Sequence, residues 1–280
     1  MTTRTRFAPS PTGFLHIGHA YSAFVAARKA TESNGELRLR IENIDKTRCK
    51  KEYEIAIQED LSWLGLEWSE PVLNQADRMA IYDEALNSLI NESLLYHCFC
   101  TRKDITQHHK KTNTHNKKGS AGLYPGICRH LSKLEVEKKL STGQSFALRL
   151  KMERAVEKTG SLTWYEQNTG QKKANPEKFG DIIIARKELK TSYHIACVID
   201  DDAQKINLIT RGMDLYEMTH IHVLLQSLLN IPTPTYFHHK LILDSDGQKL
   251  AKTRDSTSIR QLKNQGYQPE DILRMIGLFS

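Results

Sequence analysis

The chain has 280 residues, of which 39% are hydrophobic and 26% are charged, a composition typical of a globular protein with a buried core. Its 40 basic and 33 acidic side chains give a formal net charge of +7, which mildly favours a polyanionic partner such as nucleic acid. There is no run of 18 apolar residues, which excludes a transmembrane helix, and no membrane is expected among the partners. The polar N-terminus also lacks the apolar stretch of a secretory signal.

The first part of the chain alternates between strand and helix patterns. A short strand is expected at 5–8 and an alanine-rich helix at 18–30. Apolar residues then alternate with charged ones at 37–42, which is the period of a strand with one buried face. Two more helices are expected at 52–64 and 78–95, separated by Pro71. The order strand, helix, strand, helix predicts a parallel α/β sheet.

The second part begins with a tract at 103–119 that is polar, basic and rich in histidine, and its lack of periodicity predicts an exposed, mobile loop. A helix is expected at 215–229, a turn at 244–247, and two short helices at 258–264 and 269–278. Asp200-Asp201-Asp202 is interpreted as a turn between two strands rather than a magnesium site. Strands are expected at 146–150, 162–165, 182–185, 195–199, 206–209 and 239–243.

The loop between the first strand and the first helix is the most informative stretch, and it ends in His16-Ile17-Gly18-His19. A helix start exposes unpaired N–H groups and the positive end of the helix dipole, which suits a phosphate. Gly18 lets a flat group such as adenine lie against the backbone, and His16 and His19 can donate hydrogen bonds to a phosphate. The alternative is an ordinary turn with two surface histidines.

A second candidate element, Lys249-Leu250-Ala251-Lys252-Thr253, follows the expected turn. Two ammonium groups three positions apart can reach the same triphosphate and neutralise the pyrophosphate leaving group. Taken alone, this stretch is equally typical of a solvated basic loop.

Together these elements resemble the HIGH and KMSKS signatures of the class I aminoacyl-tRNA synthetases, with Ala251 in place of the usual serine. The resemblance implies a Rossmann-type parallel-sheet α/β catalytic domain with an inserted α+β acceptor-type subdomain. It also implies magnesium bound with ATP. The implied catalytic residues are His16, His19, Lys249 and Lys252, and the implied ATP site is His16, Gly18, His19 and Lys252.

Two further strings, at 6–13 and 39–45, are similar to the RFAPSPTG and LRIEDTD-like segments of glutamyl and glutaminyl members. Because arginine offers a planar fork for a carboxylate, Arg6 is expected to bind the glutamate side chain, with Ser10 as an accessory donor. Glu42 is expected to bind the substrate ammonium; the alternative is a strand-end carboxylate that caps the next turn. The resemblance adds further residues to this pocket: Phe7, Ala8, Pro9, Tyr193 and Arg211.

Arg211 lies in the segment 210–215, which resembles a VRGxDL string of the family. Here Gly212 is expected to permit a tight turn, and Asp214 to cap the following helix.

Five cysteines are present, and three of them cluster as Cys98, Cys100 and Cys128. A disulfide framework would spread and pair its cysteines, so the pattern predicts a reducing cytoplasm and suggests a metal. Three thiolates and the Tyr124 phenolate can complete a tetrahedral zinc site. A free, buried cysteine pair is the alternative, and a histidine could replace Tyr124 as the fourth ligand; the candidates are His108, His109, His115 and His130.

The segments 96–102 and 122–129 are similar to the glutamyl-queuosine tRNA(Asp) synthetases, a branch that uses a Cys, Cys, Tyr, Cys zinc site. The resemblance implies one structural zinc bound by Cys98, Cys100, Tyr124 and Cys128. It covers residues 6–278 and includes no anticodon-binding module. The implied segments are a first Rossmann half at 1–97, a zinc-containing insertion at 98–180, a second Rossmann half at 181–236, and a lysine-loop region with C-terminal helices at 237–280.

The expected partners are therefore ATP, L-glutamate and a tRNA(Asp) that carries queuosine. Two alternatives remain. One is a minimal or split glutamyl-tRNA synthetase that charges the tRNA acceptor end. The other is a non-catalytic tRNA-binding paralogue that has kept the fold, which the replacement at Ala251 and the basic tract at 110–118 favour slightly.

Overall fold

The computed structural model describes residues 2–112, 123–242 and 257–278. One parallel sheet is formed by β1 (Arg4–Phe7), β2 (Glu36–Ile41) and β3 (Ser69–Asn74). The crossover connections contain α1 (Ile17–Thr31) and α2 (Lys51–Trp63), which bury alanine and aliphatic side chains against the sheet. This arrangement confirms the parallel α/β prediction.

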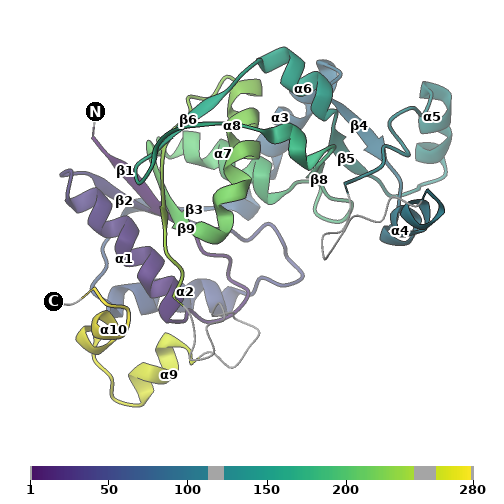
Figure 1. Ribbon diagram of the computed structural model, residues 1–280. Helices are drawn as coiled ribbons and strands as arrows, with labels where there is room; N and C mark the ends of the chain where they lie inside the picture. Colours follow the sequence, from purple (N-terminus) through teal and green to yellow (C-terminus); the bar gives the residue numbers. More distant parts are fainter. Residues whose placement is uncertain (1, 113–122, 243–256, 279–280) are drawn as a thin grey trace.

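A second sheet has the order β7-β6-β10-β9. Its strands β9 (Leu208–Gly212) and β10 (Thr235–His239) are parallel, and β10 also pairs in parallel with β6 (Thr163–Glu166). Strand β7 (Gly170–Lys173) pairs antiparallel with β6 as a hairpin. Strand β9 reaches the first sheet, because the N–H of Asn207 donates to the carbonyl oxygen of Arg4 (3.2 Å). The two sets of parallel strands therefore meet at β1 and β9 (Figure 1).

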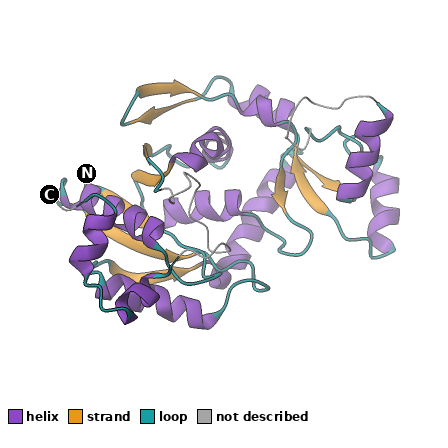
Figure 2. Cartoon of the chain, turned by 60° about the horizontal axis from the view of Figure 1, so that its bottom comes forward, coloured by secondary structure: helices purple, strands orange, loops and turns teal. Residues whose placement is uncertain are grey.

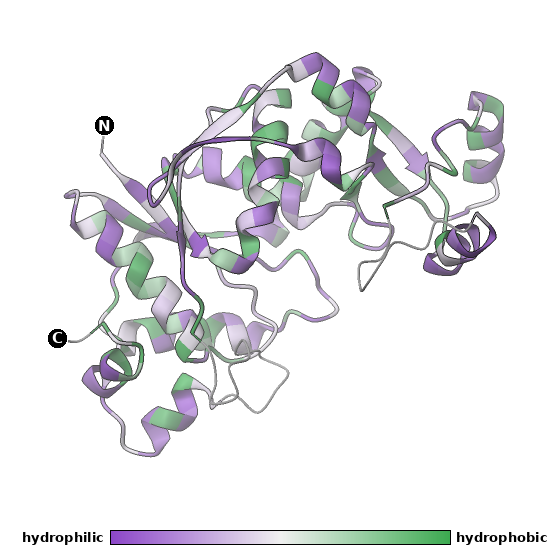
Figure 3. Ribbon diagram, in the orientation of Figure 1, coloured by the Kyte–Doolittle hydropathy of each residue, from purple (hydrophilic) through white to green (hydrophobic). Residues whose placement is uncertain are grey.

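The main helical core lies beside these strands. Helices α7 (Tyr193–Ala203) and α8 (Thr219–Leu228) are joined by β9 and the 3-10 helix η3 (Met213–Met218). They pack with α3 (Met79–Asn91) and α6 (Met152–Thr159) through buried aliphatic side chains. Figure 3 shows hydrophobic residues gathered along these central helices. The short 3-10 helices η1 (Gln75–Arg78) and η2 (Pro176–Phe179) lead into this core.

A smaller part of the molecule is built on an antiparallel sheet (Figure 2). It contains β4 (Leu95–Cys98), β5 (Ala147–Leu150) and β8 (Ile183–Ala185), with α4 (Arg102–Lys111) and α5 (Lys133–Ser141) at its outer end. The chain ends in α9 (Ile259–Asn264) and α10 (Pro269–Met275), which pack against α1 and α2. None of the described helices has the length and apolar character needed to cross a membrane.

Several expectations were wrong. Residues 195–199 lie in helix α7, not in a strand, because this helix is buried and its continuous apolar run imitates a buried strand. Asp200, Asp201 and Asp202 consequently lie in the last turn of α7 and not between two strands. The helix expected at 78–95 ends at Asn91, and Ser93 adopts a positive φ of 59° before β4 begins.

The tract at 103–119 is not a loop throughout. Residues 102–111 form α4, whose first turn is closed by a reciprocal capping box between Thr101 and Asp104. The helix buries no residue and is largely hydrophilic (Figure 3), which explains the lack of an apolar period. Residues 113–119 lie outside the described part of the chain, as does the turn expected at 244–247.

Two strands were misplaced or missed. Strand β10 occupies Thr235–His239, so the strand expected at 239–243 starts where β10 ends. Strand β3 was missed because Pro71 read as a break. Pro71 is tolerated inside this strand because β3 is an edge of its sheet, where a missing N–H leaves no ladder bond unmade.

Candidate active site

A cavity of about 410 Å³ opens beyond the carboxyl ends of β1, β2, β9 and β10. Ligands of open parallel sheets bind at this edge. Nearly all of the residues predicted to bind nucleotide or amino acid line the cavity: Arg6, Phe7, Ala8, Pro9, Ser10, His16, Gly18, His19, Glu42, Tyr193 and Arg211. The exceptions are Lys249 and Lys252, which lie outside the described residues, as does Ala251.

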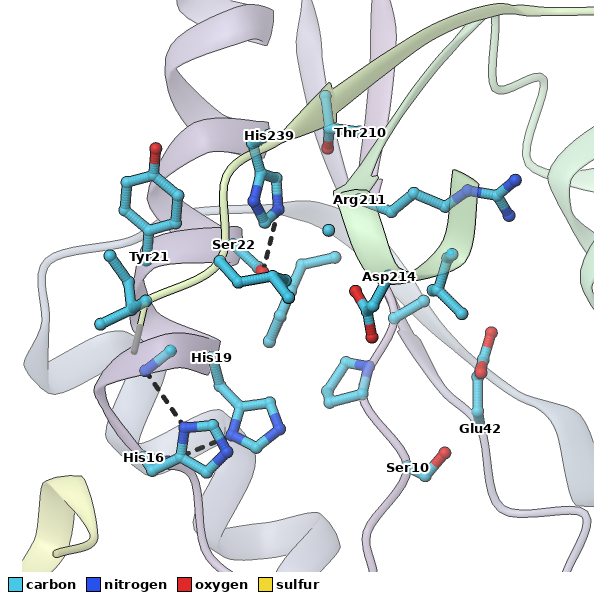
Figure 4. Close-up of a pocket in the computed structure, with 18 of the residues that line it drawn as sticks. Ser10, His16, His19, Tyr21, Ser22, Glu42, Thr210, Arg211, Asp214 and His239 are labelled. Carbon is cyan, nitrogen blue, oxygen red and sulfur yellow. Dashed lines mark hydrogen bonds between the residues drawn. The ribbon is translucent and has the colours of Figure 1, made fainter. Parts of the chain in front are cut away.

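The two histidines form one end of the cavity (Figure 4, left). His16 is the N-cap of α1, and its Nδ1 accepts from the N–H of Gly18 (3.1 Å). In return, Nδ1 of His19 accepts from the N–H of His16 (3.2 Å), and the two ring centroids lie 3.7 Å apart. Since both Nδ1 atoms accept, each neutral ring carries its proton on Nε2. The helix start therefore offers two imidazole donors together with its own N–H groups, a set that suits a phosphate.

Glu42 and Arg211 lie toward the other end of the cavity (Figure 4, right). Arg40 Nη2 donates to Glu42 Oε1 (3.1 Å), which fixes the carboxylate where β2 ends. Burial raises the pKa of Glu42, and the neighbouring Arg40 and Arg6 oppose that rise. Burial also raises the pKa of Tyr193 far above its usual value, so its phenol stays protonated and can donate. This end therefore combines a carboxylate with guanidinium and phenol donors.

Arg6 is held by a buried carboxylate that sequence reasoning missed. Its Nε donates to Asp201 Oδ1 (2.9 Å), and its Nη1 donates to the carbonyl oxygen of Thr210 (2.9 Å). Asp201 Oδ1 also accepts from Arg40 Nη1 (2.7 Å). Burial disfavours the charged form, but the two guanidiniums outweigh it and lower the pKa of Asp201 to about 2. Asp201 therefore links the arginine expected to bind substrate to the arginine that fixes Glu42.

The adjacent Asp200 has a different role. It accepts from Gln75 Nε2 (2.9 Å), Arg78 Nε (2.7 Å) and the Tyr82 hydroxyl (2.7 Å), and its own carboxylate is completely buried. These contacts tie η1 and α3 to α7. The sequence could have indicated this role only if the apolar run at 195–199 had been recognised as a helix that continues into the three acidic residues. That run was interpreted as a strand instead.

Gly212 has an ordinary backbone angle, with a φ of −66°, and what distinguishes the position is the close approach of two neighbouring side chains. A Cβ at this position would lie 2.4 Å from Asp214 Oδ1 and 2.8 Å from Leu241 Cδ2. The residue that caps η3 is Gly212 itself, so the expectation that Asp214 caps the helix was wrong. Asp214 instead lines the cavity between the histidines and Glu42 (Figure 4).

A second candidate site lies in the smaller part of the molecule. The sulfur atoms of Cys98, Cys100 and Cys128 lie within 4.8 Å of one another, and the Sγ atoms of Cys100 and Cys128 are 3.4 Å apart. The Tyr124 hydroxyl is 3.4 Å from Cys98 Sγ and 3.5 Å from Cys100 Sγ. A tetrahedral zinc site with Zn–S bonds of about 2.3 Å has ligands about 3.8 Å apart. The four side chains therefore fit such a site.

The surroundings favour a thiolate at Cys98, whereas the pKa of Cys128 is raised by its hydrogen bond with Cys98 and by burial, and the pKa of Tyr124 is raised by burial and its contacts with the cysteines. Hydrogen bonds with Cys128, Tyr124 and Arg149 lower the pKa of the Cys98 thiol to about 4, despite its burial. Among the described histidines, which include those at 108, 109 and 130, none joins the three sulfur atoms within 4.8 Å. His115 lies outside the described residues.

The chain matches a family model over residues 2–280, and that family is described as the catalytic domain of class I tRNA synthetases (E and Q). It is 42% identical, over 98% of its length, to the glutamyl-Q tRNA(Asp) synthetase of Rhodobacter capsulatus, and the match covers 99% of that protein. It is 38% identical to the glutamate–tRNA ligase of Hydrogenobaculum sp., of which the match covers only 58%.

A solved structure gives the same picture. The chain superimposes with a TM-score of 0.81 and 26% identity on the glutamate–tRNA ligase of Elizabethkingia meningosepticum, which was crystallised with its amino acid. The likeness covers 99% of this chain and 61% of that one. The chain therefore belongs to the catalytic-domain family of the class I glutamyl- and glutaminyl-tRNA synthetases, a family of ligases.

Proposed function

We propose that the protein activates glutamate with ATP and transfers it to the queuosine base at the wobble position of tRNA(Asp). The observation that carries the choice of acceptor is the 42% identity to the R. capsulatus protein, which extends over nearly the whole of both chains. The cavity supports the activation step, because its two ends offer donors for a phosphate and a charged set for an amino acid.

In the first step, an oxygen of the α-carboxylate of glutamate attacks the α-phosphorus of ATP. The bond between this phosphorus and the oxygen that bridges to the β-phosphate breaks. Glutamyl-adenylate forms and pyrophosphate leaves. Arg6 and Arg211 orient the side-chain carboxylate of glutamate, and Glu42 binds its ammonium group. Nε2–H donors of His16 and His19 stabilise the charge that grows on the phosphate. ATP enters with magnesium, which neutralises part of that charge.

In the second step, a hydroxyl of the queuosine cyclopentene ring attacks the carbonyl carbon of the adenylate. The ester forms, AMP leaves, and the hydroxyl proton passes to solvent or to the leaving phosphate. No protein nucleophile is needed, since the adenylate is already activated. Because ATP and tRNA meet in the cytoplasm, we infer that the protein works there.

The transfer is tested with labelled glutamate, ATP and three RNAs: tRNA(Asp) with queuosine, tRNA(Asp) with guanosine at the wobble position, and tRNA(Glu). We expect label only on the queuosine form. Label on tRNA(Glu) would favour a minimal glutamyl-tRNA synthetase. Glutamate-dependent ATP–pyrophosphate exchange, measured without RNA, separates an enzyme from a non-catalytic binder, which would show neither reaction.

The four-residue cluster is proposed to hold one structural zinc ion per chain through Cys98, Cys100, Tyr124 and Cys128. Its support is the convergence of three sulfur atoms and one phenol oxygen. A closed four-ligand site of this kind stabilises its surroundings and does not catalyse. It would hold the segment after β4 to the segment that precedes α5.

We expect purified protein to contain one zinc ion per chain by elemental analysis, and a cobalt-exchanged sample to show a thiolate-to-cobalt absorption band. Cys128→Ser is expected to lose the metal and to lower the melting temperature by roughly 5 °C, since a metal ligand and its loop closure are lost. Tyr124→Phe should keep a weaker site with altered cobalt absorption. His130→Asn, on an exposed side chain nearby, is the control and should leave both measurements unchanged. Metal-free native protein would contradict the proposal.

A further inference from the structure

Arg211 is fixed by acceptors on three nitrogen atoms. Its Nε donates to His238 Nε2 (3.1 Å), its Nη1 to His222 Nδ1 (3.1 Å), and its Nη2 to Thr219 Oγ1 (2.7 Å). All three partners are almost completely buried. A guanidinium has five N–H donors, so one N–H remains on each of Nη1 and Nη2 among the contacts of the described residues.

These contacts determine which histidine nitrogens carry protons. A guanidinium can only donate, so His238 Nε2 and His222 Nδ1 must both accept. The proton of His222 is therefore on Nε2, from which it donates to His194 Nδ1 (3.2 Å). The proton of His238 is on Nδ1. Burial and the charge of Arg211 lower the pKa of His238 to about 4, which keeps its ring neutral at pH 7.

Glu166 accepts two hydrogen bonds from His238. The backbone N–H of His238 donates to Glu166 Oε1 (3.0 Å), and its ring Nδ1 lies 2.5 Å from Glu166 Oε2. Glu166 is 2% exposed and comes from β6, which pairs with β10, the strand of His238. A carboxylate offers only acceptors, so both contacts oblige His238 to donate.

We propose that Glu166 is a positioning residue for the substrate arginine. It fixes the tautomer of His238 that accepts from Arg211, and so it directs the remaining N–H groups of Arg211 into the cavity. Because the role of Arg211 rests on the proposed function, Glu166 would set the affinity for glutamate without touching it. A hairpin outside the two Rossmann halves of the sequence interpretation would thereby contribute to amino acid recognition.

Glu166→Gln is the decisive variant. The backbone N–H of His238 needs an acceptor, so the amide oxygen of glutamine faces it and the amide NH₂ faces Nδ1 of the ring. Nδ1 must then accept, and its proton moves to Nε2. Nε2–H then faces the Nε–H of Arg211 (3.1 Å) and has only Thr219 Oγ1 (3.3 Å) as an acceptor among its described contacts. The Nε–H of Arg211 thereby loses its buried acceptor, and Thr219 Oγ1 is drawn from Arg211 Nη2 toward the ring. We therefore expect KM for glutamate to rise by about 10- to 100-fold in ATP–pyrophosphate exchange. KM for ATP should change less than about twofold, since the histidine end is untouched.

Glu166→Asp keeps an acceptor-only carboxylate and should recover much of the glutamate affinity. Glu177→Gln, on an exposed residue of η2, is the matched control and should behave as wild type. A merely structural role of Glu166 would lower the melting temperature and change both KM values together, and that outcome would overturn the proposal.

Nitrogen-15 NMR of the imidazole rings tests the network without any variant. Wild-type protein should carry its proton on Nδ1 of His238 and on Nε2 of His222 and His194. The opposite tautomer of His238 in wild type, or a wild-type KM in Glu166→Gln after its tautomer has changed, would refute the proposal. Failure of wild-type protein to activate glutamate would instead refute the proposed function, because the tautomers are measured independently of activity.

Discussion

Replacement of His16 by asparagine is expected to lower the rate of glutamate-dependent ATP–pyrophosphate exchange by about 100- to 1000-fold, the usual cost of removing one preorganised donor from a developing oxyanion. The side chain of His16 has two separable roles. Its Nδ1 caps α1 by accepting from the N–H of Gly18, and its Nε2–H takes no part in this cap. Asparagine is a favoured N-cap residue whose oxygen can replace Nδ1, but its amide cannot reach as far as Nε2.

Exchange kinetics and thermal unfolding together distinguish these roles. The folding free energy of His16→Asn should stay within about 1 kcal/mol of wild type, since the cap is kept. The effect should appear mainly in kcat, because the donor is used more strongly in the transition state than in the ground state. His130→Asn supplies the control on an exposed histidine outside the cavity. Exchange within a few fold of wild type would exclude His16 from the chemistry.

Motifs allowed the cavity to be predicted because its residues are carried by strand ends. Strand β1 ends in the loop that leads to His16, and β2 ends immediately before Glu42. Parallel strands bring such ends to one edge of the sheet, so neighbouring motifs become neighbouring side chains. The alternation at 37–42 was sufficient for β2, and the alanine-rich run was sufficient for α1.

Long-range polar contacts could not be predicted in this way. Asp201 meets Arg6 across 195 positions of the chain, and Glu166 meets His238 across 72. Both carboxylates are buried because a guanidinium or an imidazole stands opposite, and the sequence gives no period that connects them. The error at 195–199 contributed, since a strand there would place Asp201 in a solvent-exposed turn.

The assignment of segments 1–97, 98–180, 181–236 and 237–280 stays a prediction. The pairing of β6 with β10 nevertheless limits how independent the second segment can be, because a strand inside 98–180 belongs to the same sheet as β9. The role of the lysines at 249 and 252 also stays a prediction.

Asp201→Asn is expected to lower the free energy of unfolding by about 3–5 kcal/mol, which is typical when one partner of a buried ion pair is removed. The carboxylate accepts from both Arg6 and Arg40, and all three side chains are buried. Asparagine keeps the shape but removes the one carboxylate that both guanidiniums contact among the described ion pairs, while the pair of Arg40 with Glu42 remains. Urea denaturation measures the loss. Glutamate activation should fall as well, because Arg6 and Glu42 are both held through this network.

The neighbouring residue provides a matched control, since Asp202→Asn makes the same chemical change one position away. Asp202 is 41% exposed and lies 3.8 Å from Lys205, so its removal should cost less than about 0.5 kcal/mol. The pKa of Asp201 is depressed to about 2, so its contribution is fully present above the unfolded value near 3.8 and is lost only as the pH falls toward 2. The difference between wild type and Asp201→Asn should therefore stay constant from pH 6 to 8. A difference that vanished within that range, or equal losses for Asp201→Asn and Asp202→Asn, would show that the buried network does not hold the site.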